Sequence, residues 1–119
     1  MITTLEIPEG VTKINDKVFY GCSSITSVLF PSSLESIGES AFSECKSLKN
    51  IEIGENVKYI GDNAFANCSS LTSIKIPTSI TSIAEYVSSA CYSLTRIELP
   101  SSVTSIGGSA FEYCSRLTS

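Results

Sequence analysis

Apolar residues recur along the chain in a pattern that repeats every 23 residues. Each copy reads approximately L-x-x-I-x-I-P-x-x-V-x-x-I-G-x-x-A-F-x-x-C-x-x in one-letter code. A fixed period of this size is typical of solenoids, in which each copy buries its apolar face only against its neighbours. The pattern therefore predicts one repeat domain over residues 1–119, with five copies and an incomplete sixth that begins at Leu117: 2–24, 25–47, 48–70, 71–93 and 94–116.

Each copy is predicted to contain two extended segments. The first alternates apolar and polar residues with a β-branched bias, as in Ile51-Glu52-Ile53, which favours a strand. Proline follows it in four copies and Gly54 in the third, and the strand is expected to end there because proline has no N–H to donate. The second segment is shorter and covers residues 57–60 in the third copy. Stacked in parallel, equivalent strands would pair about 4.8 Å apart.

A turn is predicted after the second segment. In the third copy Gly61 precedes Ala64, Phe65 and Cys68, a spacing that predicts a helical or 3₁₀ turn with Ala64 and Cys68 on one face. The predicted fold is a β-rich solenoid of parallel strands and short helical turns. Its interior is predicted to contain two columns of like residues: Phe19, Phe42, Phe65 and Phe111, and Cys22, Cys45, Cys68, Cys91 and Cys114.

The elements IxIP, xxV, xxIG, xxAF and xxC, which are clearest at 74–83 and 99–114, resemble the BspA-like leucine-rich repeats, also called the Treponema pallidum type. The resemblance covers residues 2–116. It implies a right-handed leucine-rich-repeat solenoid, a β/α superhelix, with a role in adhesion and protein binding at the cell surface. The implied partner is a protein, of the extracellular-matrix or host type. The resemblance implies no catalytic residues and no cofactor.

Composition and charge exclude several functions. The net charge of −4 disfavours nucleic acid, because phosphate binding requires a basic face. The chain has no histidine, which removes the commonest general base and metal ligand, so we do not expect an enzyme. No apolar run approaches the roughly 20 residues that span a bilayer.

The cellular location stays open at this stage. The first ten residues lack the basic start and the apolar segment of a signal peptide. Reduced thiols suit the cytosol, whereas the family resemblance suits the cell surface or secretion. The missing signal would also result if the chain were a fragment of a longer array.

The cysteine column has two interpretations. Neighbouring Cα atoms about 5 Å apart would lie within the range of a disulfide. The Cβ vectors of stacked residues are parallel, however, and no C-x₂-C pair or histidine completes a zinc site. We therefore expect buried, reduced and unreactive thiols that act as small apolar side chains.

A column of acidic residues is the second candidate site. It consists of Asp16, Glu39, Asp62 and Glu85, and Gly108 interrupts it in the fifth copy. These residues either bind cations, which prefer oxygen ligands, or cap the N–H groups of the turns that they begin. One carboxylate per copy does not supply the six to eight oxygens that calcium prefers, which favours capping, and we predict no metal site.

The outward positions of the first strand supply the candidate binding residues: Leu29, Asn50, Glu52, Lys75, Arg96 and Glu98. Glu52, Lys75 and Glu98 alternate in sign, an arrangement that suits neighbouring strands because opposite charges attract. Leu29 stands where the other copies have charged residues. It is either a contact point for a partner or an isolated surface leucine.

The fourth copy departs from the pattern at two interior positions. Ala84 stands where three copies have glycine, and Ser88 stands where the other four have phenylalanine. Loss of a buried ring would cost roughly 3–5 kcal/mol if the space stayed open, so we expect Tyr86 or Tyr92 to fill it or the backbone to shift. The departure reflects either a functional site or sequence drift.

Two functions remain. The first is a non-catalytic protein-binding scaffold that uses its strand face. The second is a structural spacer or self-assembly segment of a larger surface protein. The uncapped ends have two explanations. Either the chain is a fragment of a longer array, or it forms a homo-oligomer, because an uncovered terminal strand is a template for association.

Overall fold

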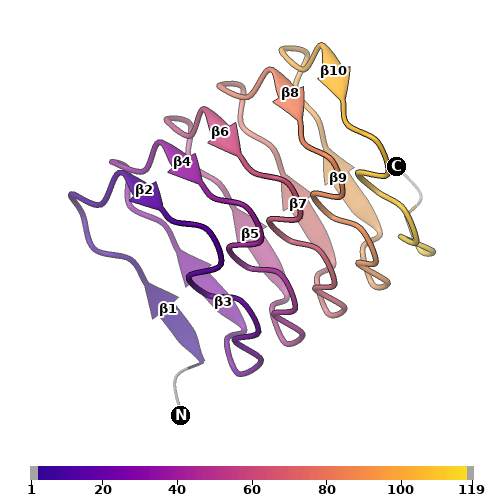
Figure 1. Ribbon diagram of the computed structural model, residues 1–119, viewed down its shortest axis with the longest axis horizontal. Coiled ribbons are helices and arrows are strands. Elements are labelled where there is room, and N and C mark those ends of the chain that lie inside the picture. The colour runs from indigo at the N-terminus through magenta and orange to yellow at the C-terminus, as the bar shows by residue number, and fades with distance from the viewer. Residues whose placement is uncertain (1–2, 118–119) are drawn as a thin grey trace.

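The computed structural model describes residues 3–117, which form a solenoid of short parallel strands without a helix. Figure 1 shows two rows of strands along the solenoid, the odd-numbered strands in one row and the even-numbered strands in the other. We call each turn of the solenoid a coil and number coils 1 to 5 by their strand pairs. The strands are β1 (Thr4–Glu6), β2 (Lys13–Ile14), β3 (Ser27–Leu29), β4 (Ser36–Ile37), β5 (Asn50–Glu52), β6 (Tyr59–Ile60), β7 (Ser73–Lys75), β8 (Ser82–Ile83), β9 (Arg96–Glu98) and β10 (Ser105–Ile106).

Every strand pair is parallel and in register at the repeat length. Ile51 lies opposite Ile74, and Ile74 lies opposite Ile97. The pairs form the sheets β1-β3 and β5-β7-β9 in one row, and β2-β4-β6 and β8-β10 in the other. Equivalent side chains therefore stack on one another, and the predicted solenoid of parallel strands is confirmed.

The segment after each short strand is not helical, contrary to the prediction. Two residues of every coil have positive φ there, as at Asn63 (φ 60°) and Asn67 (φ 60°) in coil 3. A right-handed helix excludes such left-handed residues, so the chain forms successive turns instead. Successive backbone N–H groups donate alternately to the next coil and to their own coil. Phe65 N–H donates to Val87 O of the next coil at 2.8 Å, and Ala66 N–H donates to Asn63 O of its own coil at 3.1 Å.

Phenylalanine rings stack through the first three coils. The ring centroids of Phe19 and Phe42 lie 5.3 Å apart, and those of Phe42 and Phe65 lie 5.6 Å apart. Ser88 is buried at the equivalent position of coil 4, before the half-buried Phe111 of coil 5. The expectation that a tyrosine fills this place is wrong, because Tyr86 is 40% exposed and Tyr92 is 51% exposed.

The cysteine column lies beside the rings, and its thiols are unpaired. Each thiol from coil 2 onward donates a hydrogen bond to a carbonyl of the preceding coil, as Cys68 Sγ does to Phe42 O at 3.2 Å. Burial is the main cause that raises the pKa of Cys45 to about 11 and that of Cys91 to about 12. At neutral pH these thiols therefore remain protonated donors that link consecutive coils.

Three of the five coils have a glycine directly after the short strand. We call these residues the glycine column, and they lie where consecutive coils approach closely. A Cβ on Gly61 would lie 2.6 Å from the backbone nitrogen of Glu39, and one on Gly107 would lie 2.6 Å from that of Glu85. Coil 4 carries such a Cβ at Ala84, and β6 and β8 are not paired within residues 3–117. We attribute this break in the row of even-numbered strands to the Cβ of Ala84. The break is local, because the turns of coils 3 and 4 remain hydrogen-bonded to each other.

Candidate protein-binding face

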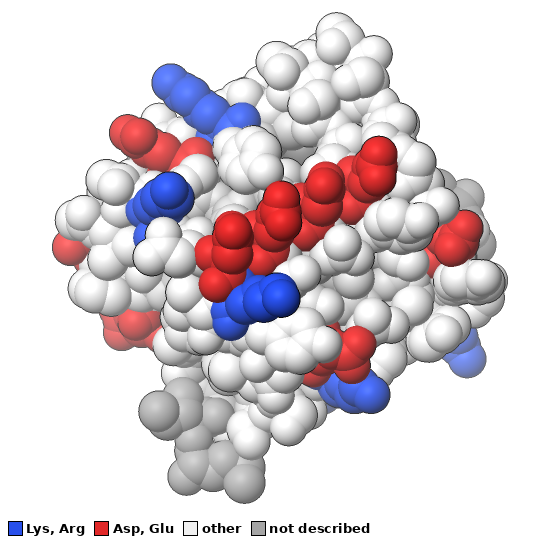
Figure 2. All heavy atoms as spheres, in the orientation of Figure 1, with Lys and Arg blue, Asp and Glu red and all other residues white. Residues whose placement is uncertain are grey.

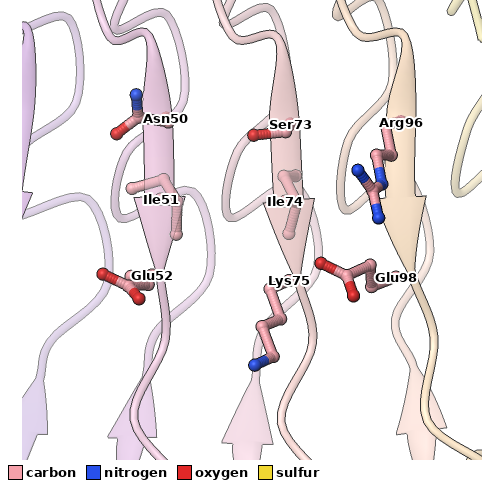
Figure 3. A pocket seen from close by; sticks show the side chains of 8 residues that line it. All are labelled: Asn50, Ile51, Glu52, Ser73, Ile74, Lys75, Arg96 and Glu98. Carbon is pink, nitrogen blue, oxygen red and sulfur yellow. The ribbon is translucent and has the colours of Figure 1, made fainter.

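The long strands place the predicted binding residues on one surface. We call this surface the strand face and define it by the outward side chains of β3, β5, β7 and β9. Because strand side chains alternate, Ile51 and Ile74 point into the core and are buried. Figure 3 shows the row Asn50, Ser73 and Arg96 beside the row Glu52, Lys75 and Glu98, in the order that the strand register gives.

All six predicted binding residues are exposed. Five lie within the sheet β5-β7-β9: Asn50, Glu52, Lys75, Arg96 and Glu98. Leu29 is 55% exposed on β3, which the described part of the chain does not pair with β5. The structure therefore brings five of the residues together and leaves Leu29 at the border of the group.

The charged side chains of the strand face have no partner among residues 3–117. Between residues 3 and 117 the one ion pair joins Lys46 and Glu44, at 3.6 Å. The side chains of Glu52, Lys75, Arg96 and Glu98 take part in no hydrogen bond or ion pair with the described residues. Exposed ion pairs contribute only about 0–1 kcal/mol, so alternating charge does not by itself bring the groups together. The charges remain available to a ligand.

The strand face is hollowed at two adjoining places. The first hollow has a volume of about 320 Å³ and lies over β5, β7 and β9. The second, of about 380 Å³, lies where β5 ends, and we call it the Gly54 notch; its walls include Phe30, Pro31 and Ile53. Glu52 and Lys75 line both hollows, so the two lie next to each other.

The Gly54 notch was not predicted from the sequence. Gly54 is the one position of its column that lacks a proline ring. A Cβ built on Gly54 meets no atom within 4 Å, so the space beside it is open. The absence of a proline at residue 54 was the one sequence feature that could have predicted the notch. In the sequence analysis Gly54 served, like the prolines of the other copies, only to place the end of the strand.

The acidic column lies on the side of the molecule that carries the short strands. Figure 2 shows a row of acidic side chains that runs along the stack of coils on this side. Asp16 Oδ1 accepts the N–H of Glu39 at 2.9 Å, and Asp62 Oδ1 accepts the N–H of Glu85 at 3.1 Å. The aspartates thus cap a backbone group of the following coil, whereas the prediction placed the cap within their own turn.

The acidic column also affects the pKa of a neighbouring tyrosine. Partial burial and the charges of Glu39, Asp62 and Asp16 raise the pKa of the exposed Tyr59 phenol. Among residues 3–117 no group of three or more ligating side chains is arranged to hold a metal ion. The two aspartates of the column have a structural role in the hydrogen bonds between coils.

The N-terminal end of the described solenoid has an apolar surface. Two hollows of about 510 and 360 Å³ open there. Their walls include Leu5, Phe19, Cys22 and Val11, whose equivalents in the middle coils are buried. No helix in the described part of the chain is long and apolar enough to cross a membrane.

Comparison with known proteins gives a consistent result. The sequence pattern of the BspA type leucine rich repeat region matches residues 1–118 in six copies. A leucine-rich repeat protein of T. pallidum is 36% identical, with a TM-score of 0.93. One from Bacteroides ovatus is 30% identical with a TM-score of 0.76, and a leucine-rich cell surface protein of Faecalibacterium prausnitzii is 28% identical with a TM-score of 0.62.

These similarities extend over almost the whole chain, of which they cover 98%, 98% and 99%. The chain spans 56% of the T. pallidum protein, 36% of the B. ovatus protein and 47% of the F. prausnitzii protein. None of the three is described as an enzyme, and a comparison with curated proteins gives no significant match. On its sequence pattern and its fold, the chain belongs to the family of BspA-type leucine-rich repeat proteins.

Proposed function

We propose that the chain is a non-catalytic scaffold that binds a protein partner on its strand face. The observation that carries this proposal is a group of charged side chains on β5, β7 and β9 that surround a hollow and have no partner in the described part of the chain. Arg96 on this surface is of a residue type that is enriched at protein interfaces, and the other polar side chains resemble those of an interface rim. The net charge of −4 makes nucleic acid a poor partner.

The setting that we propose is adhesion at a cell surface, with a host or extracellular-matrix protein as the partner. The F. prausnitzii relative is described as a cell surface protein, which supports this setting for the chain. The chain spans about half the length of the T. pallidum and F. prausnitzii relatives, and the proposal concerns binding by this stretch alone.

The test is a selection from a displayed random-peptide library against the immobilised chain. A variant with Leu29→Ala, Glu52→Ala, Lys75→Ala and Arg96→Ala removes the strand-face side chains, all of which are exposed. We expect the selected peptides to lose at least tenfold in affinity for this variant and none for Lys58→Ala, which lies outside the strand face. Selected peptides that bind the wild type and the fourfold variant equally would contradict the proposal.

A second function, a structural or self-assembling segment, is favoured by one observation. The apolar surface at the coil 1 end consists of side chains whose equivalents are covered by a neighbouring coil in the middle of the stack. Stacking of a second copy there would be head to tail, and such contacts generate open chains. Light scattering after gel filtration tests it: a mass that rises with concentration supports stacking, and a constant monomer mass up to millimolar concentration excludes it.

A further inference from the structure

We propose that the strand face binds a second copy of this chain, face to face, in a two-fold symmetric dimer. The two-fold axis runs along the solenoid, between the two rows of outward side chains. This inference goes beyond the proposed function, because it concerns what covers the same surface when no other protein is bound there. It follows from the strand register and from the order of the charges on β5, β7 and β9.

The two rows of outward side chains differ in charge. The first row has one positive charge and no negative one, and consists of Asn50, Ser73 and Arg96. The second row has two negative charges on either side of a positive one, and consists of Glu52, Lys75 and Glu98. Neighbours within a row lie about 4.8 Å apart, and the rows lie about 6.6 Å apart, because every second residue of a strand points outward. The strand face therefore carries two parallel lines of opposite net charge.

The charges of the two rows are not paired within one copy. Arg96 and Glu98 lie on the same strand, two residues apart, and form no ion pair. Glu52 and Lys75 lie opposite each other on β5 and β7 and form none either. None of the four side chains has another polar partner among residues 3–117. A partner for these charges must therefore come from another molecule.

A two-fold rotation about an axis along the solenoid exchanges the two rows. The first row of one copy then faces the second row of the other, coil against coil. In this dimer Arg96 faces the partner's Glu98, and Asn50 faces the partner's Glu52. The hydroxyl and the ammonium group on β7 face each other in the same way. Each contact occurs twice, because a two-fold interface is self-complementary.

The same charges disfavour other face-to-face arrangements. If the two-fold axis ran along β7, Lys75 would face the partner's Lys75 and Glu52 would face the partner's Glu98. Like charges in opposition suppress association. A shift of one copy by one coil would separate Arg96 from the partner's Glu98. The surface thus selects one arrangement, in which the strands of the two copies are antiparallel and the solenoid axes are parallel.

The dimer contact is small, so the dimer is weak. Each strand contributes two outward side chains, which is fewer in total than the roughly 20–30 residues on each side of a standard interface. The hollow of about 320 Å³ over β5, β7 and β9 gives room for the side chains of the second copy. Leu29 on β3, which is 55% exposed, adds an apolar contact beside the axis. We expect a dissociation constant of about 0.1–1 mM at low salt.

Charge reversal at Arg96 and Glu98 tests the arrangement. Sedimentation equilibrium is measured at low salt for the wild type, Arg96→Glu and Glu98→Arg. Each single reversal should weaken the dimer at least about tenfold, because it places like charges opposite each other twice. An equimolar mixture of the two variants should associate at least as tightly as the wild type, since every carboxylate then faces a guanidinium. The proposal fails if both variants associate like the wild type, or if the mixture associates no better than either variant alone.

Two controls separate this dimer from other association. Lys58→Glu, outside the strand face, should leave the dissociation constant unchanged. Head-to-tail stacking of coils would continue beyond two copies and would not respond to the charges of the strand face. A mass that exceeds that of a dimer and rises equally in all variants would overturn the proposal.

A library-selected peptide that requires the strand face distinguishes this inference from the proposed function. Because the two ligands share one surface, a saturating peptide should convert the dimer to monomers. If the peptide binds but the chain remains monomeric at about 1 mM without it, this inference fails and the proposed function stands. If the dimer forms as described but no selected peptide requires the strand face, the proposed function fails and this inference stands.

Discussion

Coils 3 and 4 depart from the common repeat in opposite places. Coil 3 keeps its interior glycine and phenylalanine, Gly61 and Phe65, and departs at the surface, where Gly54 replaces proline. Coil 4 keeps the proline that follows its long strand and departs beside the core, at Ala84 and Ser88. The interior departure coincides with a broken strand pair, and the surface departure coincides with an open notch. Position on the coil therefore decides whether a substitution alters the stack or the binding surface.

The largest loss of stability is expected from a substitution in the interior. Phe65→Ser gives coil 3 the residue that coil 4 has at this position, and removes a buried ring stacked on Phe42. We expect a loss of about 3–5 kcal/mol in the free energy of unfolding, measured in urea. A loss below about 1 kcal/mol would mean that the ring column does not stabilise the stack, and the distinction between coils 3 and 4 would fail.

A smaller loss of stability is expected from a substitution in the glycine column. In Gly61→Ala the new Cβ would lie 2.6 Å from Glu39 N, so coils 2 and 3 must separate at a cost of about 1–3 kcal/mol. Gly54→Ala is the matched control, because its Cβ meets no atom within 4 Å.

Hydrogen exchange of the residue 61 amide provides a second measurement. This amide donates to Ile37 O at 2.8 Å in the wild type. We expect its exchange to accelerate in Gly61→Ala and not in Gly54→Ala. Equal stabilities of the two variants would refute the close-approach explanation for the break at Ala84.

The cysteine column is continuous through coils 3 and 4, since Cys68 and Cys91 are both fully buried. Burial raises the pKa of both thiols above the usual value near 9, in the case of Cys91 to about 12. The neutral thiol is therefore favoured by folding, and the resulting stabilisation is complete below about pH 8.5. It is lost as the pH rises toward the folded-state pKa values.

We accordingly expect the urea midpoint to be constant from pH 7 to about 8.5 and to fall between about pH 9 and 12. Circular dichroism follows the transition. Cys68→Ala removes one titrating group and should make the fall less steep. A midpoint that does not change up to pH 11 would show that the thiols are not protected from ionisation in the folded protein.

Much of the architecture could be predicted from the repeat, because stacking converts a 23-residue period into columns of like residues. The turns could not. Asn63 is a residue type that tolerates positive φ, but Lys17 and Tyr86 have the same conformation without any such tendency. Hydrogen bonds between coils impose it. A local spacing that suits a helix therefore says little where every second N–H has a partner in the next coil.

The binding surface was only partly accessible to sequence reasoning. Alternation along the strands is enough to place Glu52, Lys75 and Arg96 on the outside. Whether neighbouring charges pair depends on side-chain geometry, and the expected attraction between Glu52 and Lys75 produces no ion pair. The notch depends on the space around Gly54, which no sequence pattern gives.

The most direct test of the strand face is a map of amide chemical-shift changes. The isotopically labelled chain is titrated with a library-selected binder. We predict that the largest changes fall in residues 50–55, 73–75 and 96–98, and that Asp16, Asp62 and the turns show none. Changes concentrated on the acidic column or the turns, with the strand-face amides unaffected, would contradict the account.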